Sequence, residues 1–134
     1  MTAPDGLRAD TPLASMYFDV RDRVVGAVAM MTDEQLARPV PACPAWTVHG
    51  LFAHLVSTPM TILAGDIPES VMGGGDPNPW LARLVEDNLD RSIVDLARWW
   101  AGDDDALATV VAGAGLLLVD LFIHEGDLHG AVGS

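Results

Sequence analysis

The feature that most constrains this sequence is a spacing of apolar residues by three and four positions, repeated in several segments. In the first segment these residues share one helical face, and charged residues fall on the opposite side. Strands would show alternation with a period of two between turn signals, and no segment does so convincingly. The chain is therefore predicted to fold from helices. The first apolar face consists of Leu13, Met16, Tyr17, Val20, Val24, Ala27, Val28 and Met31.

Four helices are predicted, over residues 11–31, 47–65, 79–101 and 104–129. Thr11 and Pro12 suit the start of the first helix, and Pro59 leaves open whether the second ends early. Residues 32–35 are predicted to form a capped turn or a short helix. An antiparallel four-helix bundle is the economical arrangement of these helices, so residues 1–134 are expected to form one all-α domain. The fourth helix is apolar nearly all round in its first half and is expected to be the most buried.

Composition excludes several classes of function. A formal net charge of −12, with seven arginines and no lysine, argues against binding to nucleic acid or to anionic membranes. The single cysteine, Cys43, excludes an intramolecular disulfide and a cysteine-rich zinc site. The apolar stretch 106–119 is shorter than the roughly 20 residues of a membrane span, and no signal peptide is recognisable. We expect a soluble, reduced, cytoplasmic domain.

The candidate site begins where polar residues interrupt the fourth predicted helix. Each residue advances about 100° around a helix, so His124 lies about 40° and Asp127 about 20° from Asp120. One face therefore presents a carboxylate, an imidazole and a second carboxylate. Glu125 points elsewhere and is expected in solvent. His129 lies on the opposite side and is expected to interact with the helix dipole rather than with the site.

A buried carboxylate without a partner is costly, and His54 in the second predicted helix is a candidate partner. If the second and fourth helices are neighbours, His54, Asp120 and His124 converge inside the bundle. Two imidazoles and a carboxylate leave coordination positions open and suit Zn²⁺, Fe²⁺ or Ni²⁺. The alternative is a simple hydrogen-bonded or ionic pair on one helix. His49 is expected at the surface, and Cys43 is expected to be an inert thiol.

Three stretches together resemble a known family. Residues 40–56 read VPACPAWTVHGLFAHLV, residues 120–133 read DLFIHEGDLHGAVG, and residues 32–36 read TDEQL. These motifs resemble those of the metal-binding N-terminal domain of mycothiol-dependent maleylpyruvate isomerases, which is part of the DinB-like superfamily. His54 and His124 match the two histidines of the motifs. Asp120 matches a position that looks to be occupied by Glu in the isomerase and by His in other DinB-like proteins. Asp127 matches an aspartate of the family that supports a metal ligand or contributes to helix packing.

The resemblance implies a DinB-like four-helix bundle that binds a divalent metal, zinc first, with nickel or iron as alternatives. It implies metal ligation by His54, Asp120 and His124, and actinobacterial chemistry in which mycothiol or another small thiol attacks an electrophilic small molecule. No catalytic residue is assigned. The alternatives are a non-catalytic module that binds a small ligand or forms a homodimer, and a domain with no metal. Such proteins commonly have a further C-terminal domain, so the chain is expected to be a stand-alone domain or a fragment, for which maleylpyruvate isomerisation on its own is doubtful.

Overall fold

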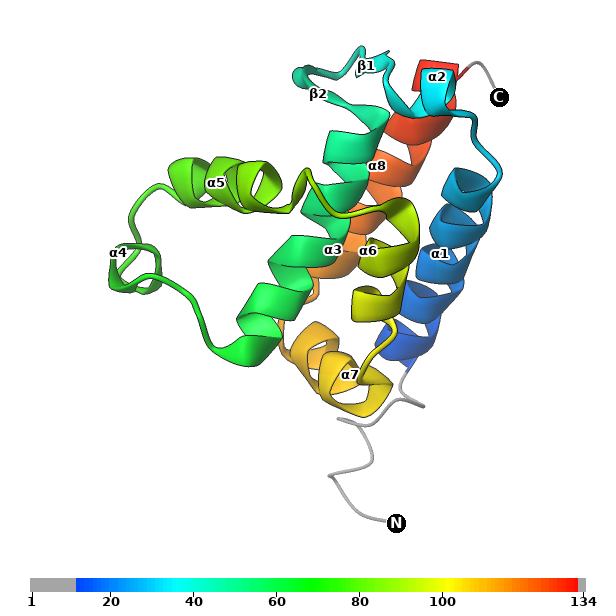
Figure 1. The fold of residues 1–134 in the computed structure, drawn as a ribbon. Helices are drawn as coiled ribbons and strands as arrows, with labels where there is room; N and C mark the ends of the chain where they lie inside the picture. Colours follow the sequence, from blue (N-terminus) through cyan, green and yellow to red (C-terminus); the bar gives the residue numbers. More distant parts are fainter. Residues whose placement is uncertain (1–11, 133–134) are drawn as a thin grey trace.

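The computed structural model describes residues 12–132, and most of these residues are helical (Figure 1). The all-α prediction is confirmed, apart from one short β-hairpin. Thr11, the predicted first cap, lies outside the described residues. In chain order the elements are α1 (Pro12–Ala29), α2 (Asp33–Leu36), β1 (Pro39–Val40), β2 (Cys43–Thr47), α3 (Val48–Ala64), α4 (Glu69–Met72), α5 (Asn78–Asn88), α6 (Ile93–Trp100), α7 (Asp104–Gly113) and α8 (Leu116–Val132).

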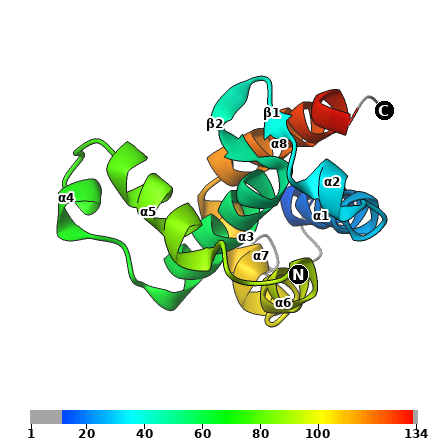
Figure 2. The ribbon, with the colours of Figure 1, turned by 45° about the horizontal axis from the view of Figure 1, so that its top comes forward.

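Helix α3 lies at the centre of the molecule, in contact with α5, α6, α7 and α8, while α1 packs against α7 and α8 (Figures 1 and 2). Every residue of α3 from Gly50 to Met60 is buried, including the polar His54. In α8 only Leu118, Leu121 and Leu128 are buried. The prediction that the fourth helix would be the most buried is therefore wrong. Its apolar residues exceed what its neighbours can cover, whereas α3 has helices on several sides.

Local signals define both ends of α3. The hydroxyl of Thr47 accepts a hydrogen bond from the backbone N–H of Gly50 at 3.1 Å, which caps the first turn. Gly65 ends the helix in the left-handed conformation with φ of 79°, which favours glycine because it has no Cβ. The helix continues through Pro59 to Ala64, so the proline does not stop it. The predicted start and end of this helix are close to the observed ones.

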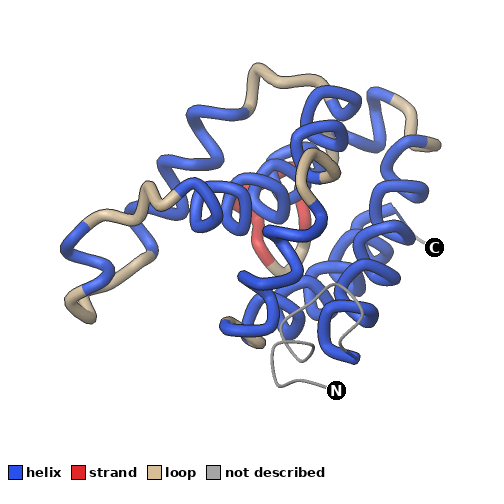
Figure 3. The backbone as a smooth tube through the Cα atoms, turned by 90° about the horizontal axis from the view of Figure 1, so that it is seen from below, coloured by secondary structure: helices blue, strands red, loops and turns tan. Residues whose placement is uncertain are grey.

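The segment between α1 and α3 contains the short helix α2 and a small hairpin. Thr32 and Gln35 form a complete capping box on α2, as the sequence predicted. Strands β1 and β2 pair antiparallel, and β1 contacts α8 (Figure 3). The prolines exclude helix here as predicted, but the strands were not predicted, because they are too short to show alternation. The hairpin places Cys43 and Trp46 directly before α3.

Two predicted helices are each divided in the structure, so their continuity was predicted wrongly. Residues 79–101 form α5 and α6, and the hydroxyl of Ser92 caps the new helix by accepting from the N–H of Asp95 at 3.1 Å. Residues 104–129 form α7 and most of α8, which meet at a bend of 102°. No single helix among the described residues is long and apolar enough to cross a membrane; α7 and α8 pass that test only as this bent pair.

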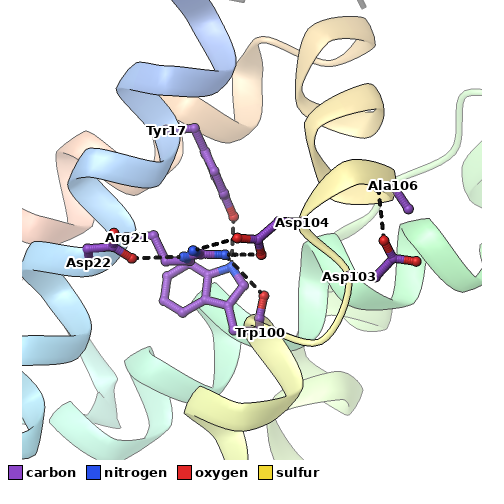
Figure 4. Close-up of polar contacts among 7 residues, drawn as sticks. All are labelled: Tyr17, Arg21, Asp22, Trp100, Asp103, Asp104 and Ala106. Carbon is purple, nitrogen blue, oxygen red and sulfur yellow. Dashed lines mark hydrogen bonds and ion pairs between the residues drawn. The ribbon is translucent and has the colours of Figure 1, made fainter. Parts of the chain in front are cut away.

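A buried polar cluster joins α1 to the connection between α6 and α7 (Figure 4). The Arg21 guanidinium, in a residue only 7% exposed, donates to both carboxylate oxygens of Asp104 at 2.7 and 3.2 Å. The indole N–H of Trp100 donates to the hydroxyl of Tyr17 at 2.9 Å. Burial raises the pKa of Tyr17 well above its usual range, although the Trp100 hydrogen bond opposes this. The phenol therefore stays neutral, and the cluster fixes α1 against α6 and α7.

Candidate metal centre

The structure brings His54, Asp120 and His124 together between α3 and α8. Asp120 Oδ2 lies 3.0 Å from His54 Nε2, and Asp120 Oδ1 lies 3.1 Å from His124 Nε2. One ligand atom from each of the three residues lies within 4.8 Å of the other two. Asp120 and His124 are neighbours because a spacing of four places them on one face of α8, whereas His54 reaches them across the α3–α8 contact. One carboxylate is thus shared by two imidazoles.

The remaining ring nitrogens of the two histidines also have partners. His124 Nδ1 lies 2.9 Å from Asp127 Oδ2, and His54 Nδ1 lies 3.3 Å from Thr58 Oγ1. An ionised carboxylate is only an acceptor, so Nδ1–H of His124 donates to Asp127. A neutral His124 ring would then have its lone pair on Nε2, whereas the protonated ring, which the raised pKa favours, donates Nε2–H to Asp120. Asp127 thereby fixes the orientation and tautomer that coordination through Nε2 requires.

The charges of the cluster stabilise each other. Burial on its own would raise the pKa of Asp120, but the hydrogen bonds from His124 and His54 outweigh it and lower that pKa well below its usual range. The hydrogen bond with Asp120 raises the pKa of His124, and Asp127 adds to this effect against partial burial. Asp120 is therefore a carboxylate at neutral pH. The two imidazoles are nearly buried, with side chains 6% and 14% exposed, while the Asp120 side chain is 40% exposed.

Two residues of the hairpin adjoin this cluster. The Trp46 ring lies over the His54 ring, with a centroid distance of 4.9 Å and an angle of 31° between the planes. Ligand atoms of Cys43, His124 and Asp127 lie within 4.8 Å of one another. Burial raises the pKa of the Cys43 thiol, and the charges of Asp127 and Asp120 raise it further, which agrees with an inert thiol. Sequence reasoning did not place Cys43 beside the site, because that proximity depends on the hairpin.

Other candidate residues lie outside the cluster. Glu125 forms a bidentate ion pair with Arg23 at 2.9 and 3.0 Å, so it points away from the site as predicted. The prediction that it lies in solvent is wrong, because this pairing leaves its side chain only 16% exposed. His49 is half-buried, and its Nε2 lies 2.8 Å from the backbone oxygen of Arg91. His129 belongs to neither group of candidate ligands among the described residues. Thr58 was not singled out, although its position four residues after His54 on a helix would have indicated the contact.

A protein-family comparison connects this geometry to known proteins. The model of the mycothiol maleylpyruvate isomerase N-terminal domain matches residues 17–115. The chain belongs to this family. The matched range includes the hairpin and all of α3 with His54, and it ends just before α8. Searches of curated proteins and of solved structures give no significant match. The inclusion of Asp120 and His124 in the site therefore depends on the observed geometry.

The donor set fits a divalent transition metal. Zinc bonds to imidazole nitrogen and carboxylate oxygen of about 2.0–2.2 Å place neighbouring ligand atoms roughly 3.3–3.5 Å apart in a tetrahedral site. The ligand atoms of the three residues lie within 4.8 Å of one another, and the two nitrogen–oxygen separations of 3.0 and 3.1 Å, to different oxygens of Asp120, are also those of hydrogen bonds. Two imidazoles and one carboxylate are ligands suited to zinc, iron or nickel, and three ligands leave coordination positions for another molecule.

Proposed function

We propose that this domain binds one divalent cation through His54 Nε2, His124 Nε2 and the Asp120 carboxylate, with zinc as the first candidate. The supporting observation is the direction in which His124 presents its two nitrogens. Nδ1 lies 2.9 Å from Asp127, and Nε2 lies 3.1 Å from Asp120. In the neutral ring, whose one N–H donates to Asp127, a lone pair on Nε2 faces a carboxylate oxygen. Two acceptors at this distance require a positive charge between them.

A bound cation and a proton on His124 are the two ways to supply that charge. A cation would use both imidazoles, because His54 also directs Nε2 at the same carboxylate. A histidine that donates its other N–H to a carboxylate is a common support for metal ligands. The position of His54 also falls inside the family match. In the alternative, a protonated and metal-free cluster, both Nε2–H groups donate to Asp120, and metal analysis distinguishes the two forms.

The family name supports a more specific function, the use of a small thiol such as mycothiol on an electrophilic small molecule. When bound, a divalent cation lowers the pKa of a thiol that it coordinates, so the thiolate forms near neutral pH. His54 and His124 would hold the centre, and Asp127 and Thr58 would keep their rings in orientation. Trp46 covers one face of the His54 ring and excludes water there. Glu125 is paired with Arg23 and is not available as a base.

Metal analysis tests the first part of the proposal. Protein purified without added metal and then exposed to zinc should hold about one equivalent after gel filtration, as expected for a single site. His54→Ala and Asp120→Ala should retain less than about a tenth of that, because each removes one of three ligands. His49→Gln is the matched control on the same helix, and it should bind zinc normally. Full zinc retention in His54→Ala, with the helical circular dichroism unchanged, would refute the proposed ligand set.

Thiol-dependent turnover tests the second part. The zinc-loaded protein is assayed with mycothiol and either maleylpyruvate or chlorodinitrobenzene, a general thiol electrophile. We expect turnover that requires zinc and is lost in His54→Ala. Stoichiometric zinc binding without turnover for either electrophile would overturn the enzymatic part and leave a non-catalytic binding module. The two experiments therefore separate the metal proposal from the thiol proposal.

A further inference from the structure

A cavity of about 890 Å³ lies on another side of α3 from the candidate metal centre. It is formed by the end of α1, by α2, by the start of α3 and by α6. His49 of α3 lines this cavity and lies about 140° around the helix from His54, which faces α8. Figure 2 shows α6 and α8 on different sides of α3. The cavity is therefore separate from the metal centre, and no candidate metal ligand lines it.

The walls of this cavity are mainly apolar. Two of the hydroxyls on its lining, those of Thr47 and Ser92, already cap α3 and α6. Small-molecule sites are typically cavities of about 300–1,000 Å³ with apolar walls and a few polar groups that orient the ligand. The volume and the walls therefore fit a small molecule with an apolar body. The apolar residues that line it include Val25, Val28, Met31, Leu36, Ile93 and Ala97.

Arg98 on α6 is the one arginine among the residues that line the cavity, and it is exposed. Within residues 12–132 Arg98 has no ion pair and no hydrogen bond from its side chain, whereas Arg21, Arg23 and Arg38 each bind a carboxylate. In the same range Arg83 and Arg91 also lack an ion pair, but neither of them lines the cavity. Asp33, at the start of α2, is the one carboxylate on the lining. Arg98 is thus available to pair with an anion from outside the chain.

His49 adds a second polar group whose tautomer is fixed. Its Nε2 lies 2.8 Å from the backbone oxygen of Arg91, which is only an acceptor, so Nε2–H donates. In the neutral ring Nδ1 is then an acceptor and cannot bind a carboxylate directly. The anion-binding group of the cavity is therefore Arg98 alone. We propose that this cavity binds a small amphipathic carboxylate, with its apolar chain between α1 and α6 and its carboxylate on Arg98. This inference is independent of the metal.

Decanoate and the neutral alcohol decanol are suitable probes, because they share a chain length and differ in charge. We expect isothermal titration to show saturable decanoate binding. The affinity for decanol should be lower by about tenfold or more, because decanol cannot form the charge-assisted hydrogen bond with Arg98. Arg98→Gln should weaken decanoate binding by a similar factor. Arg83→Gln is the matched control: Arg83 is exposed on α5, also without an ion pair, and lies outside the cavity. It should bind decanoate normally.

A second variant tests the location. Ala97→Phe places a ring in the cavity and should abolish decanoate binding, while Ala82→Phe on the exposed side of α5 should not. The proposal would be overturned by undetectable decanoate binding, by equal affinities for decanoate and decanol, or by equal effects of Arg98→Gln and Arg83→Gln. Because Arg98 is exposed, its substitution should preserve the fold even if Ala97→Phe does not. Zinc binding should be unchanged in both cavity variants.

Discussion

Replacing Asp127 by asparagine tests whether the hydrogen bond at Nδ1 of His124 controls metal affinity. Asp127 Oδ2 lies 2.9 Å from His124 Nδ1, and the two side chains are only 19% and 14% exposed. This is a charge-assisted hydrogen bond with limited access to water, which holds the ring so that Nε2 is free to coordinate. Asparagine has nearly the same size, but its side chain offers only a neutral carbonyl to the N–H.

The expected magnitude follows from the difference between these two hydrogen bonds. A hydrogen bond to a charged group contributes about 1.5–3 kcal/mol, and a neutral one about 0.5–1.5 kcal/mol. Asp127→Asn should therefore weaken zinc binding by about 1–1.5 kcal/mol, or roughly tenfold in Kd. Asp127→Ala removes the acceptor completely and should weaken binding by up to about 100-fold, the upper range for residues that support a metal ligand.

The assay is competition for zinc against a chromophoric chelator at constant pH, with circular dichroism to verify the helices. Glu125→Gln is the control, because it also neutralises an acid on α8, but one that pairs with Arg23 away from the cluster. Its Kd should equal that of the wild type. A Kd for Asp127→Asn within twofold of the wild type, together with loss of binding in His54→Ala, would refute the orienting function of Asp127.

Four further predictions can be checked by urea denaturation. Gly26→Ala should stabilise the protein by about 0.5–1 kcal/mol, since Gly26 is exposed within α1 and an added Cβ meets no atom within 4 Å. Arg21→Met should lower the free energy of unfolding by about 2 kcal/mol. This is less than the roughly 3–5 kcal/mol for breaking a fully buried ion pair, because the Asp104 side chain is 47% exposed. A double-mutant cycle with Asp104→Asn should show coupling between the two residues. Tyr17→Phe should lower the free energy of unfolding by about 1–3 kcal/mol, because it leaves the buried indole N–H of Trp100 without its acceptor. Zinc at 100 times its Kd should stabilise the wild type by about 2.7 kcal/mol and His54→Ala not at all, and a chelator should reverse the effect.

The sequence predicted the parts of the site that depend on a single helix. The face formed by Asp120, His124 and Asp127 follows from 3.6 residues per turn, and the structure shows those contacts. The approach of His54 was conditional on the second and fourth predicted helices being neighbours, which periodicity within one helix cannot determine. The place of Cys43 could not be predicted, since it depends on a hairpin whose first strand has two residues.

The helix breaks had signals in the sequence that the apolar periodicity obscured. Ser92 is followed three residues later by Asp95, a spacing that permits the observed cap of a new helix. Gly113 and Gly115 flank the 102° bend between α7 and α8, although the apolar residues continue through it. In both places the hydrophobic pattern identifies helical residues but not where one helix ends. Packing against neighbouring elements then decides the direction of the next helix.

The three candidate metal ligands differ in their exposure to solvent. His54 and His124 are nearly buried, and Asp120, whose side chain is 40% exposed, is the candidate ligand most open to solvent. Trp46 covers one face of the His54 ring. The apolar cavity beside α6 is formed on another side of the same helix, so a ligand held there would not compete for the metal. Competition between decanoate and a thiol for one site would contradict this separation.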